Sequence, residues 1–525
     1  MTGNELILLV GLAVYCLCAT ALFLYGLNCY VMIWLFSRAR QRQESEDRQL
    51  LERFRREYGD EDLPPVTVQL PVFNERFVIE RLLRAACALD YPRDLLEIQV
   101  LDDSTDDSLE LTARLVDELR AAGHDIHHIH RQERRGFKAG ALAEGMRRAR
   151  GEHFAVFDAD FVPPPDFLRR TIPFLVMDRS CGFVQTRWGH RNREFSGLTM
   201  AQSIGIDGHF VVEQSARAWN GLYLNFNGTA GVWRRRAIEE AGGWQDDTIT
   251  EDLDLSYRAQ LAGWQGRFLF DAVTPAELPT SINAFKSQQY RWAKGSIQTA
   301  MKLLPRILRQ PDVGGFKKLQ AVLHLTHYLV HPTIFVMVLL VLPLLMAARD
   351  AFQPIVVIPL LVLMVLSMAA PSTLYIFSQK VAYPGDWKRR LWYLPLLTVL
   401  GMGLAINNTL GVFGAIFGRK RRDEFVRTPK LGMLAEVHSV SGSTASLYRA
   451  GALRKKVAEY RIPLKGMFLI EGFMCLWSVA AFLQYMALYK FIIGPILLLH
   501  ATGFGYVCVT SIIHESRTRR LSAGV

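Results

Sequence analysis

The chain has 525 residues, half of them hydrophobic, and a formal net charge of +11. This length has room for a globular domain and a sizeable membrane part. The basic excess lies in loops beside apolar stretches, where anionic lipid headgroups attract it, so it does not indicate nucleic-acid binding. The seven cysteines show no CxxC spacing, and the sequence therefore predicts neither a disulfide framework nor a zinc site.

The apolar residues are gathered in long stretches. A helix needs about 20 apolar residues to cross a hydrocarbon core of about 30 Å. Five stretches meet or approach this length and are predicted to cross a membrane: residues 6–36, 319–347, 355–377, 464–489 and 491–513. The first is too long for a secretory signal and has no cleavage site before its basic flank, so it is predicted to be an anchor.

Basic clusters predict the orientation of these spans. They occupy residues 37–40, 380–390, 418–422 and 517–520. Under the positive-inside rule they lie in the cytoplasm, which places the amino terminus outside. A further apolar stretch, residues 391–417, has basic clusters on both sides and contains Asn407 and Asn408. We therefore expect it to form a re-entrant or interfacial hairpin that packs on protein and does not cross.

The part between the first and second spans has a different pattern. Residues 42–59 are charged nearly all round, which predicts a cytoplasmic linker helix. Short strand-like runs then alternate with helical patterns such as residues 77–88 and 108–121. The strand-like runs are residues 66–72, 97–101, 126–129, 153–157, 182–185 and 267–270. This alternation predicts a doubly wound α/β sheet.

Aspartates follow two of these runs. Asp102 and Asp103 end the second, and Asp158 and Asp160 come after the fourth. Open α/β sheets bind ligands at the carboxyl ends of their strands, where an aspartate can hold a base and ribose. Two carboxylates with a substrate's phosphates make a site for Mg²⁺ or Mn²⁺, so Asp158 and Asp160 are candidate metal ligands. Taken alone, Asp102 and Asp103 are equally explained by a turn with a helix cap, and an isolated Asp158-x-Asp160 is better explained by a turn or cap.

Two further segments carry charged groups suited to a sugar nucleotide. Lys138, between two glycines, offers one cation and a flexible backbone for phosphates, although a plain turn explains the glycines as well. Glu251 and Asp252 open a helical run. A sugar transfer needs one carboxylate to take the acceptor hydroxyl's proton, and Asp252 is the candidate base. Acids at this position also stabilise a helix start.

Aromatic and basic side chains follow on a predicted helix. Gln288, Arg291 and Trp292 share one helical face, because positions three and four apart are neighbours. Indole rings stack on sugars and guanidinium groups pair with diphosphates. An isolated pattern of this kind is typical of any amphipathic helix. These clusters occur in order between stretches that are predicted to cross a membrane. Together they predict an enzyme that uses a sugar nucleotide at a membrane.

The whole set resembles the family-2 glycosyltransferases of the cellulose-synthase superfamily. It comprises Asp103, Asp158-x-Asp160, Thr250-Glu251-Asp252 and Gln288-x-x-Arg291-Trp292, with Phe73-Asn74-Glu75, Lys138-Ala139-Gly140 and Phe226-Asn227-Gly228-Thr229. Residues 100–106 and 226–234 are most similar to the plant cellulose-synthase-like mannan and xyloglucan-backbone synthases. The likeness covers residues 65–309 and reappears in the membrane part.

The resemblance implies a GT-A type cytoplasmic domain inserted in a helical bundle of about five spans plus an interfacial hairpin. It implies an inverting displacement with Asp252 and Glu251 as catalytic residues, and Mg²⁺ or Mn²⁺ on Asp158 and Asp160. Binding of the nucleotide sugar is assigned to Phe73, Asn74, Glu75, Asp102, Asp103, Lys138, Asp158, Gln288, Arg291 and Trp292. Acceptor binding is assigned to Trp292, Phe226, Asn227, Gly228 and Thr229.

A second resemblance lies downstream. Phe425, Thr428 and Lys430 are similar to the FxVTxK gating loop of processive synthases, with Arg427 in the place of the valine. Loops that close over a substrate exclude water and complete a site. The alternative is that the segment is only a basic loop beside the membrane.

The resulting domain prediction has six parts. They are an anchor (residues 1–37), a linker helix (38–63), the GT-A domain (64–310), a transmembrane pair (311–378), interfacial helices with the gating loop (379–463), and a second pair with a cytoplasmic tail (464–525). His324, His327 and His331 are predicted to share a face of the second span, and Glu471 to lie inside the fourth. Such polar groups are expected to bond between helices or to line a path.

The favoured function is a processive synthase in a bacterial inner membrane or its equivalent. It would extend a β-1,4-linked glucan, mannan or glucomannan from UDP-glucose or GDP-mannose and pass the chain through its spans. The alternative is a non-processive lipid glycosyltransferase similar to ceramide or diacylglycerol glucosyltransferases. A silent scaffold is the third hypothesis. The expected partners are the donor, a polysaccharide or lipid acceptor, and membrane lipids, without nucleic acid.

Overall fold

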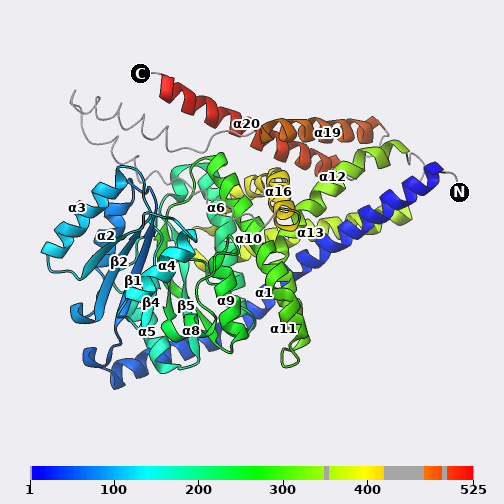
Figure 1. Cartoon of the computed structure of the whole chain (residues 1–525). Coiled ribbons are helices and arrows are strands. Elements are labelled where there is room, and N and C mark those ends of the chain that lie inside the picture. Colours follow the sequence, from blue (N-terminus) through cyan, green and yellow to red (C-terminus); the bar gives the residue numbers. More distant parts are fainter. Residues whose placement is uncertain (1–2, 348–353, 419–465, 488–493, 524–525) are drawn as a thin grey trace.

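The computed structural model describes residues 3–347, 354–418, 466–487 and 494–523. One helix, α1 (Gly3–Glu57), runs from the side of the other long helices to the sheet domain (Figure 1). No glycine or proline follows Gly26 within it, and pairs such as Arg40 with Glu44 (2.6 Å) support its polar half. The predicted anchor and linker helix are therefore one continuous helix.

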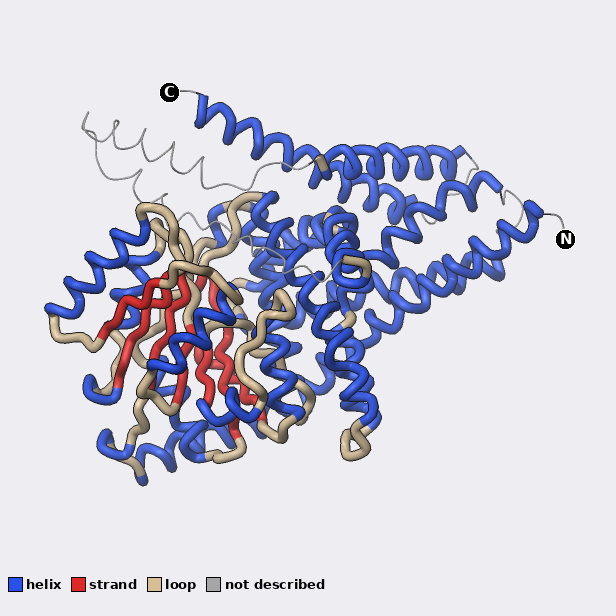
Figure 2. The backbone as a smooth tube through the Cα atoms, in the orientation of Figure 1, coloured by secondary structure: helices blue, strands red, loops and turns tan. Residues whose placement is uncertain are grey.

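A seven-stranded mixed sheet lies at the centre of the soluble part, with helices on both sides (Figure 2). Its order is β3-β2-β1-β4-β6-β5-β7. The strands are β1 (Val66–Val72), β2 (Leu96–Asp102), β3 (Ile126–His130), β4 (His153–Val156), β5 (Cys181–His190), β6 (Gly231–Arg234) and β7 (Gln265–Ala276). Every predicted strand is present, which confirms the α/β class.

The sequence pattern does not predict β6. This strand has four residues and runs antiparallel to both β4 and β5. It follows directly on residues 226–229 and brings them to the end of β4, where the Ala230 N–H donates to the Val156 carbonyl (2.8 Å). On the other side of β4 the strands are parallel, with Val72 opposite Asp102 and Gln69 opposite Val156. The segments after β1, β2 and β4 therefore meet at one edge.

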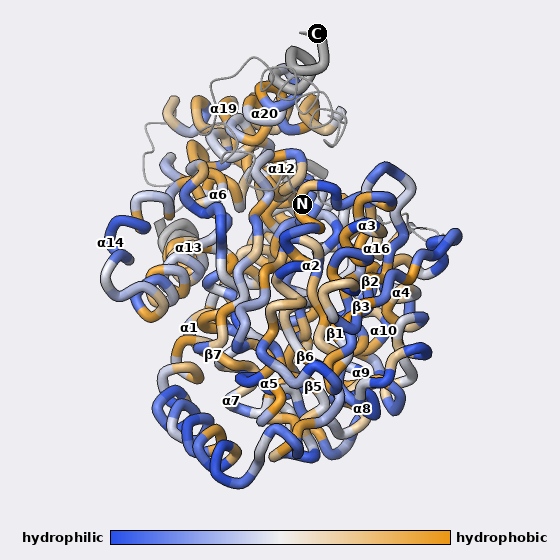
Figure 3. Tube along the Cα trace, turned by 90° about the vertical axis from the view of Figure 1, so that its left-hand side faces the viewer, coloured by the Kyte–Doolittle hydropathy of each residue, from blue (hydrophilic) through white to orange (hydrophobic). Residues whose placement is uncertain are grey.

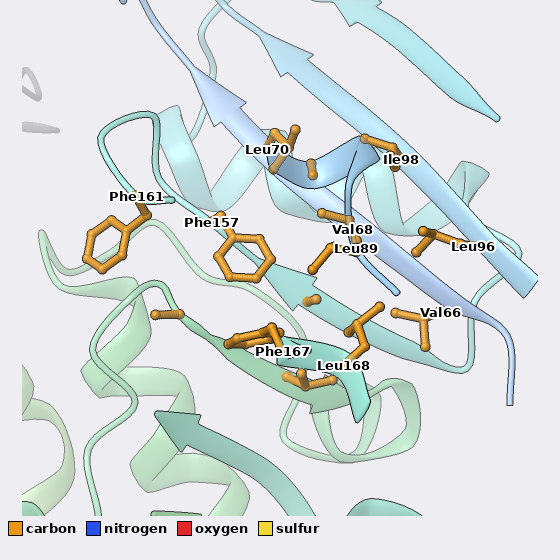
Figure 4. Packing of buried hydrophobic residues seen from close by; sticks show 14 of the residues in the cluster. Val66, Val68, Leu70, Leu89, Leu96, Ile98, Phe157, Phe161, Phe167 and Leu168 are labelled. Carbon is orange, nitrogen blue, oxygen red and sulfur yellow. The ribbon is translucent and has the colours of Figure 1, made fainter. Parts of the chain in front are cut away.

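Two apolar clusters hold this arrangement. In the first, α2 (Ile79–Cys87), α3 (Ser108–Ala121) and α5 (Phe167–Met177) pack on the sheet. Figure 4 shows Val68 and Leu70 of β1 near Phe157 and Phe167, whose ring centroids are 4.7 Å apart. In the second, the Phe36 ring of α1 packs 5.1 Å from that of Trp219. The anchor helix and the sheet domain thus share a core, which fixes the domain against the bundle.

Five of the described helices are long and apolar enough to cross a membrane, as predicted. The candidate spans are Leu8–Glu57, His327–Ala347, Val362–Ala382, Met467–Ala487 and Gly494–Ser516. The last four lie in α12 (Val330–Ala347) with the short turn before it, α13 (Pro354–Ala382), α19 (Met467–Ala487) and α20 (Gly494–Ala523). Figure 3 shows apolar residues along α13 beside hydrophilic α14 (Trp387–Arg390).

The second span differs from its predicted bounds. Residues 315–325 form a separate helix, α11 (Gly315–Leu325), and a 3-10 turn, His327–Leu329, precedes α12. The three histidines therefore do not share one helical face. His324 hydrogen-bonds the Tyr257 hydroxyl (2.7 Å), and His331 Nε2 accepts from the Asn408 amide (2.9 Å). His324 and His331 thus bond between helices, one of the two predicted roles, whereas His327 Nδ1 donates to the His324 carbonyl (2.7 Å) nearby in the chain.

The apolar stretch 391–417 forms a bent pair, α15 (Leu394–Gly403) and α16 (Ala405–Ile416). The segment Trp387–Gly403, which includes α14 and α15, meets Ala405–Ile416 at a bend of 43°. Broken spans and re-entrant segments both contain such bends, so the predicted non-crossing course of this stretch stays a prediction. The helix α16 packs on α10 (Ile282–Arg309). A Cβ on Gly411 would come within 2.9 Å of the Tyr290 carbonyl oxygen, so glycine permits this close approach.

Candidate active site

One cavity of about 220 Å³ lies at the carboxyl-end edge of the sheet. The segments after β1, β2 and β4 meet there with the start of α9 (Glu251–Leu261) and the middle of α10. Most of the predicted site residues line it, although they are far apart in the sequence. These are Phe73, Glu75, Asp103, Lys138, Asp158, Asp160, Asn227, Gly228, Glu251, Asp252, Gln288, Arg291 and Trp292.

Four predicted residues are not among those that line the cavity. Asp102 is fully buried and accepts hydrogen bonds from His128 (2.9 Å) and from the Ser104 N–H (2.8 Å). Asn74 accepts the Thr105 N–H (2.8 Å), and Thr229 Oγ1 accepts the Asp158 N–H (2.9 Å).

The fourth, Phe226, is fully buried against Trp233, with ring centroids 5.1 Å apart. Asp102 and Phe226 do not line the cavity, and their roles in donor and acceptor binding stay predictions. The predicted gating residues Phe425, Thr428 and Lys430 lie outside the described residues.

Two arginines that the sequence pattern did not single out contact Asp103 and Phe73 at the cavity. Arg131 donates to both oxygens of Asp103, from Nε at 2.7 Å and from Nη2 at 2.6 Å. The guanidinium of Arg134 lies 3.4 Å from the centre of the Phe73 ring. The two hydrogen bonds from Arg131 fix the orientation of the Asp103 carboxylate. The only signal in the sequence was the run of basic residues just before Gly136.

Lys138 connects two of the predicted clusters. Its Nζ contacts the Asp158 carboxylate and donates to the Gly228 carbonyl (2.8 Å). Burial lowers the pKa of Lys138, but the nearby Asp158, Glu251 and Asp252 outweigh burial and raise it overall. The ammonium group therefore stays charged beside the acids.

Gly228 brings the candidate base to this cation. Its φ of +77° is in the left-handed region, and a Cβ there would lie 2.8 Å from an Asp252 carboxylate oxygen and 3.3 Å from Lys138 Nζ. The lysine, the acid pair after β4 and the start of α9 thus converge at one point.

Burial perturbs the two acids at the start of α9. Desolvation raises the pKa of Asp252 to about 6, although the charge of Lys138 opposes the shift. Desolvation and then the charge of Asp252 raise the pKa of Glu251 to about 7. Asp252 Oδ1 also accepts the Leu253 N–H (2.8 Å), which orients the carboxylate. A carboxylate with a pKa near 6 can accept a proton near neutral pH.

The helix α10 closes the cavity with Gln288, Arg291 and Trp292. Burial lowers the pKa of Arg291 to about 10, which leaves it a cation at neutral pH. Gly295 lets this helix lie close to the start of α9. A Cβ on Gly295 would come within 2.4 Å of the Thr250 side chain.

The carboxylates after β4 fit a divalent metal that is shared with a substrate. Among the described residues, no group of three or more His, Cys, Asp and Glu side chains forms a complete metal site. Asp158 and Asp160 both line the cavity, and Mg²⁺ and Mn²⁺ prefer such oxygen ligands together with phosphates and water. A lone ion would find too few protein ligands here, so the donor set suits a metal that arrives with a diphosphate.

Comparisons with known proteins point to one family of enzymes. A family model described as "Glycosyltransferase like family 2" matches residues 64–295. "Glucomannan 4-beta-mannosyltransferase 2" of Arabidopsis thaliana is 35% identical over 448 residues, which are 83% of this chain and 78% of that protein. "Glucomannan 4-beta-mannosyltransferase 1" of Oryza sativa subsp. japonica is 34% identical over 464 residues, 86% of this chain and 84% of that protein.

A solved structure with a TM-score of 0.47 and 20% identity is titled as the mannosyltransferase PcManGT from Pyrobaculum calidifontis in complex with GDP-Man and Mn²⁺. The superposition covers 77% of this chain and 99% of that one.

The chain belongs to glycosyltransferase family 2, within the cellulose-synthase superfamily. It is an enzyme that transfers a sugar from a nucleotide-sugar donor, and its sheet domain has the GT-A type fold expected from the sequence. Its five candidate spans make it a membrane protein.

Proposed function

We propose that the protein is an inverting, processive β-glycosyltransferase that extends a β-1,4-linked mannan or glucomannan at the cytoplasmic face of a membrane. GDP-mannose is the proposed main donor, with UDP-glucose as a second donor for mixed chains. The observation that carries the proposal is the convergence of Lys138, Asp158 and Asp252 on Gly228 in one cavity. The names of the curated relatives support the β-1,4-mannosyl linkage.

The cavity residues divide the reaction among them. Asp103, oriented by Arg131, binds the nucleoside, and Asp158 and Asp160 would hold Mg²⁺ or Mn²⁺. When bound, that ion supplies positive charge against the departing diphosphate. Lys138 and Arg291 add fixed cations beside the Asp158 carboxylate. Such preorganised charges stabilise a negatively charged leaving group.

Asp252 is the proposed base. Its carboxylate takes the proton of the acceptor hydroxyl while that oxygen attacks the anomeric carbon and the bond to the diphosphate breaks. Attack opposite the leaving group converts an α-linked donor into a β-linked product. Trp292 lines the same cavity and offers an indole face for the acceptor sugar.

The packing of the domain supports delivery of the product to the membrane part. The helix that carries Gln288, Arg291 and Trp292 also contacts α16, and its Lys286 forms a buried ion pair with Glu471 of α19. The site thus lies on an element that is built into the bundle. We propose that the growing chain enters the bundle beside this helix and crosses the membrane there.

The test is synthesis by the full chain in membrane vesicles or nanodiscs, supplied with Mn²⁺ and radiolabelled GDP-mannose, UDP-glucose or both. The expected product is a long polymer that an endo-β-1,4-mannanase degrades. Asp252→Asn should lower transfer by about 10²–10⁴-fold through loss of the base. Asp117→Asn, at a carboxylate that is 74% exposed, should leave it unchanged. Products that carry one sugar on an extractable lipid would refute the proposal.

A further inference from the structure

One wall of the cavity carries polar residues outside the motif set. His190 ends β5, Glu277 follows β7, and both line the cavity. The two strands are neighbours, with His190 opposite Ala276. Because Glu277 is the next residue after Ala276, the side chains of this wall come from one place at the end of the β5 and β7 pair. We call Glu277 and His190 the β5–β7 wall residues.

The order of the strands places this wall beyond the acids after β4, where the proposed function puts the diphosphate. Asp103 follows β2, Asp158 and Asp160 follow β4, and β5 and β7 lie further along the same sheet. The Val162 N–H donates to the Pro275 carbonyl (2.9 Å), which ties the segment after Asp160 to the end of β7. Along the cavity, the wall therefore follows the acids to which the proposed function assigns the diphosphate. In a nucleotide sugar, the group attached beyond the diphosphate is the hexose.

Glu277 is a buried carboxylate with a fixed partner. Its side chain is 4% exposed, and its Oε1 lies 2.6 Å from Nη1 of Arg81 on α2. Burying a carboxylate is costly unless it has an ionic partner, so the ion pair with Arg81 holds Glu277 at the cavity. A carboxylate accepts hydrogen bonds at two oxygens, a geometry that suits neighbouring hydroxyls of a sugar ring.

His190 is oriented in a similar way by a second carboxylate. Its side chain is 1% exposed, and its Nε2 hydrogen-bonds Asp207 Oδ1 (3.0 Å). The other oxygen of Asp207 accepts from Gln379 on α13 (3.0 Å). The imidazole is thus fixed from behind, through Asp207, by a helix of the bundle.

We propose that Glu277 and His190 form the subsite that binds the hydroxyls of the donor hexose, with Arg81 and Asp207 as positioning residues. This inference rests on the proposed function, because it takes the ligand to be a nucleotide sugar. The nucleotide end is bound elsewhere, at Asp103 and the acids after β4. The subsite therefore contributes to binding of the whole donor and not to binding of the nucleotide alone.

The test compares two probes on the full chain in nanodiscs with Mn²⁺: GDP-mannose and GDP. In Glu277→Gln, the affinity for GDP-mannose should fall about tenfold, since a hydrogen bond to a charged group is lost. The affinity for GDP should stay within about twofold, and in transfer assays KM should rise more than kcat falls. His190→Ala should show the same selectivity. Equal losses for both probes, or no loss for either, would overturn the proposal.

Two controls separate sugar binding from structural support. Glu97→Gln alters a buried carboxylate that accepts from Thr67 Oγ1 (2.7 Å) at the opposite end of the sheet, so it should affect both probes alike. The double variant Arg81→Leu with Glu277→Leu replaces the ion pair with apolar groups and should keep the melting temperature. It should still lose the preference for GDP-mannose over GDP. If it keeps that preference, the ion pair is only structural.

A further pair of probes, UDP-glucose and UDP, distinguishes this proposal from the choice of donor. If the wild type prefers UDP-glucose and Glu277→Gln weakens UDP-glucose but not UDP, then the donor assignment is wrong and the subsite stands. If the wild type binds neither sugar nucleotide more tightly than its nucleotide, the subsite is refuted.

Discussion

Substituting Gly228 tests whether Asp252 acts from the position that the structure shows. An ordinary contact to a Cβ begins at 3.4 Å, but a Cβ on Gly228 would lie 2.8 Å from the Asp252 carboxylate. In Gly228→Ala the carboxylate must therefore move by about 0.6 Å. Misplacement of a catalytic group by about 1 Å costs about 10²-fold, so we expect kcat to fall roughly tenfold. The assay is sugar transfer at saturating donor.

Gly221 offers a matched control for backbone strain. It also has a positive φ, +64°, but a Cβ on it would meet nothing within 4 Å. Both alanine variants should lose about 1–2 kcal/mol of stability from the left-handed conformation. Loss of stability alone should therefore lower activity to a similar extent in both variants. Only Gly228→Ala should lose further activity, because only its Cβ displaces Asp252. Equal activity in the two variants would refute the assignment of Asp252, at its present position, as the base.

Two further predictions concern charge in the cavity. Because the pKa of Asp252 is raised to about 6 and the base must be deprotonated, kcat/KM should rise with pH through about 6. Lys138→Met removes a charge that lowers the pKa of Asp252, so the rise of kcat/KM should move to higher pH. A pH profile that stays unchanged would contradict the influence of the Lys138 charge on Asp252. Chelation of divalent metal should abolish transfer, and Mg²⁺ or Mn²⁺ should restore it. Asp160→Asn should then need a higher metal concentration for half-maximal rate, and activity that survives chelation would disprove the metal site.

Much of the fold follows from local patterns. Period-two and continuous apolar runs predict the strands from β1 to β5, and the predicted β1 bounds agree with the structure. The positions of the acids after β2 and β4 then predict that they meet, because parallel strands end at one edge. The helix break before Val330 is different, since residues 319–347 read as one apolar run and only the packing of α11 reveals the interruption.

The sequence by itself determined the class of protein, the membrane helices and most of the residues around the cavity. These depend on composition, on periodicity and on motif order, which are properties of neighbouring positions along the chain. The tertiary structure alone decided that β6 lies between β4 and β5, that Arg131 hydrogen-bonds Asp103 and that Arg81 forms an ion pair with Glu277. These pairings join positions that are distant along the chain, so no local pattern encodes them, and they depend on how the sheet and helices pack.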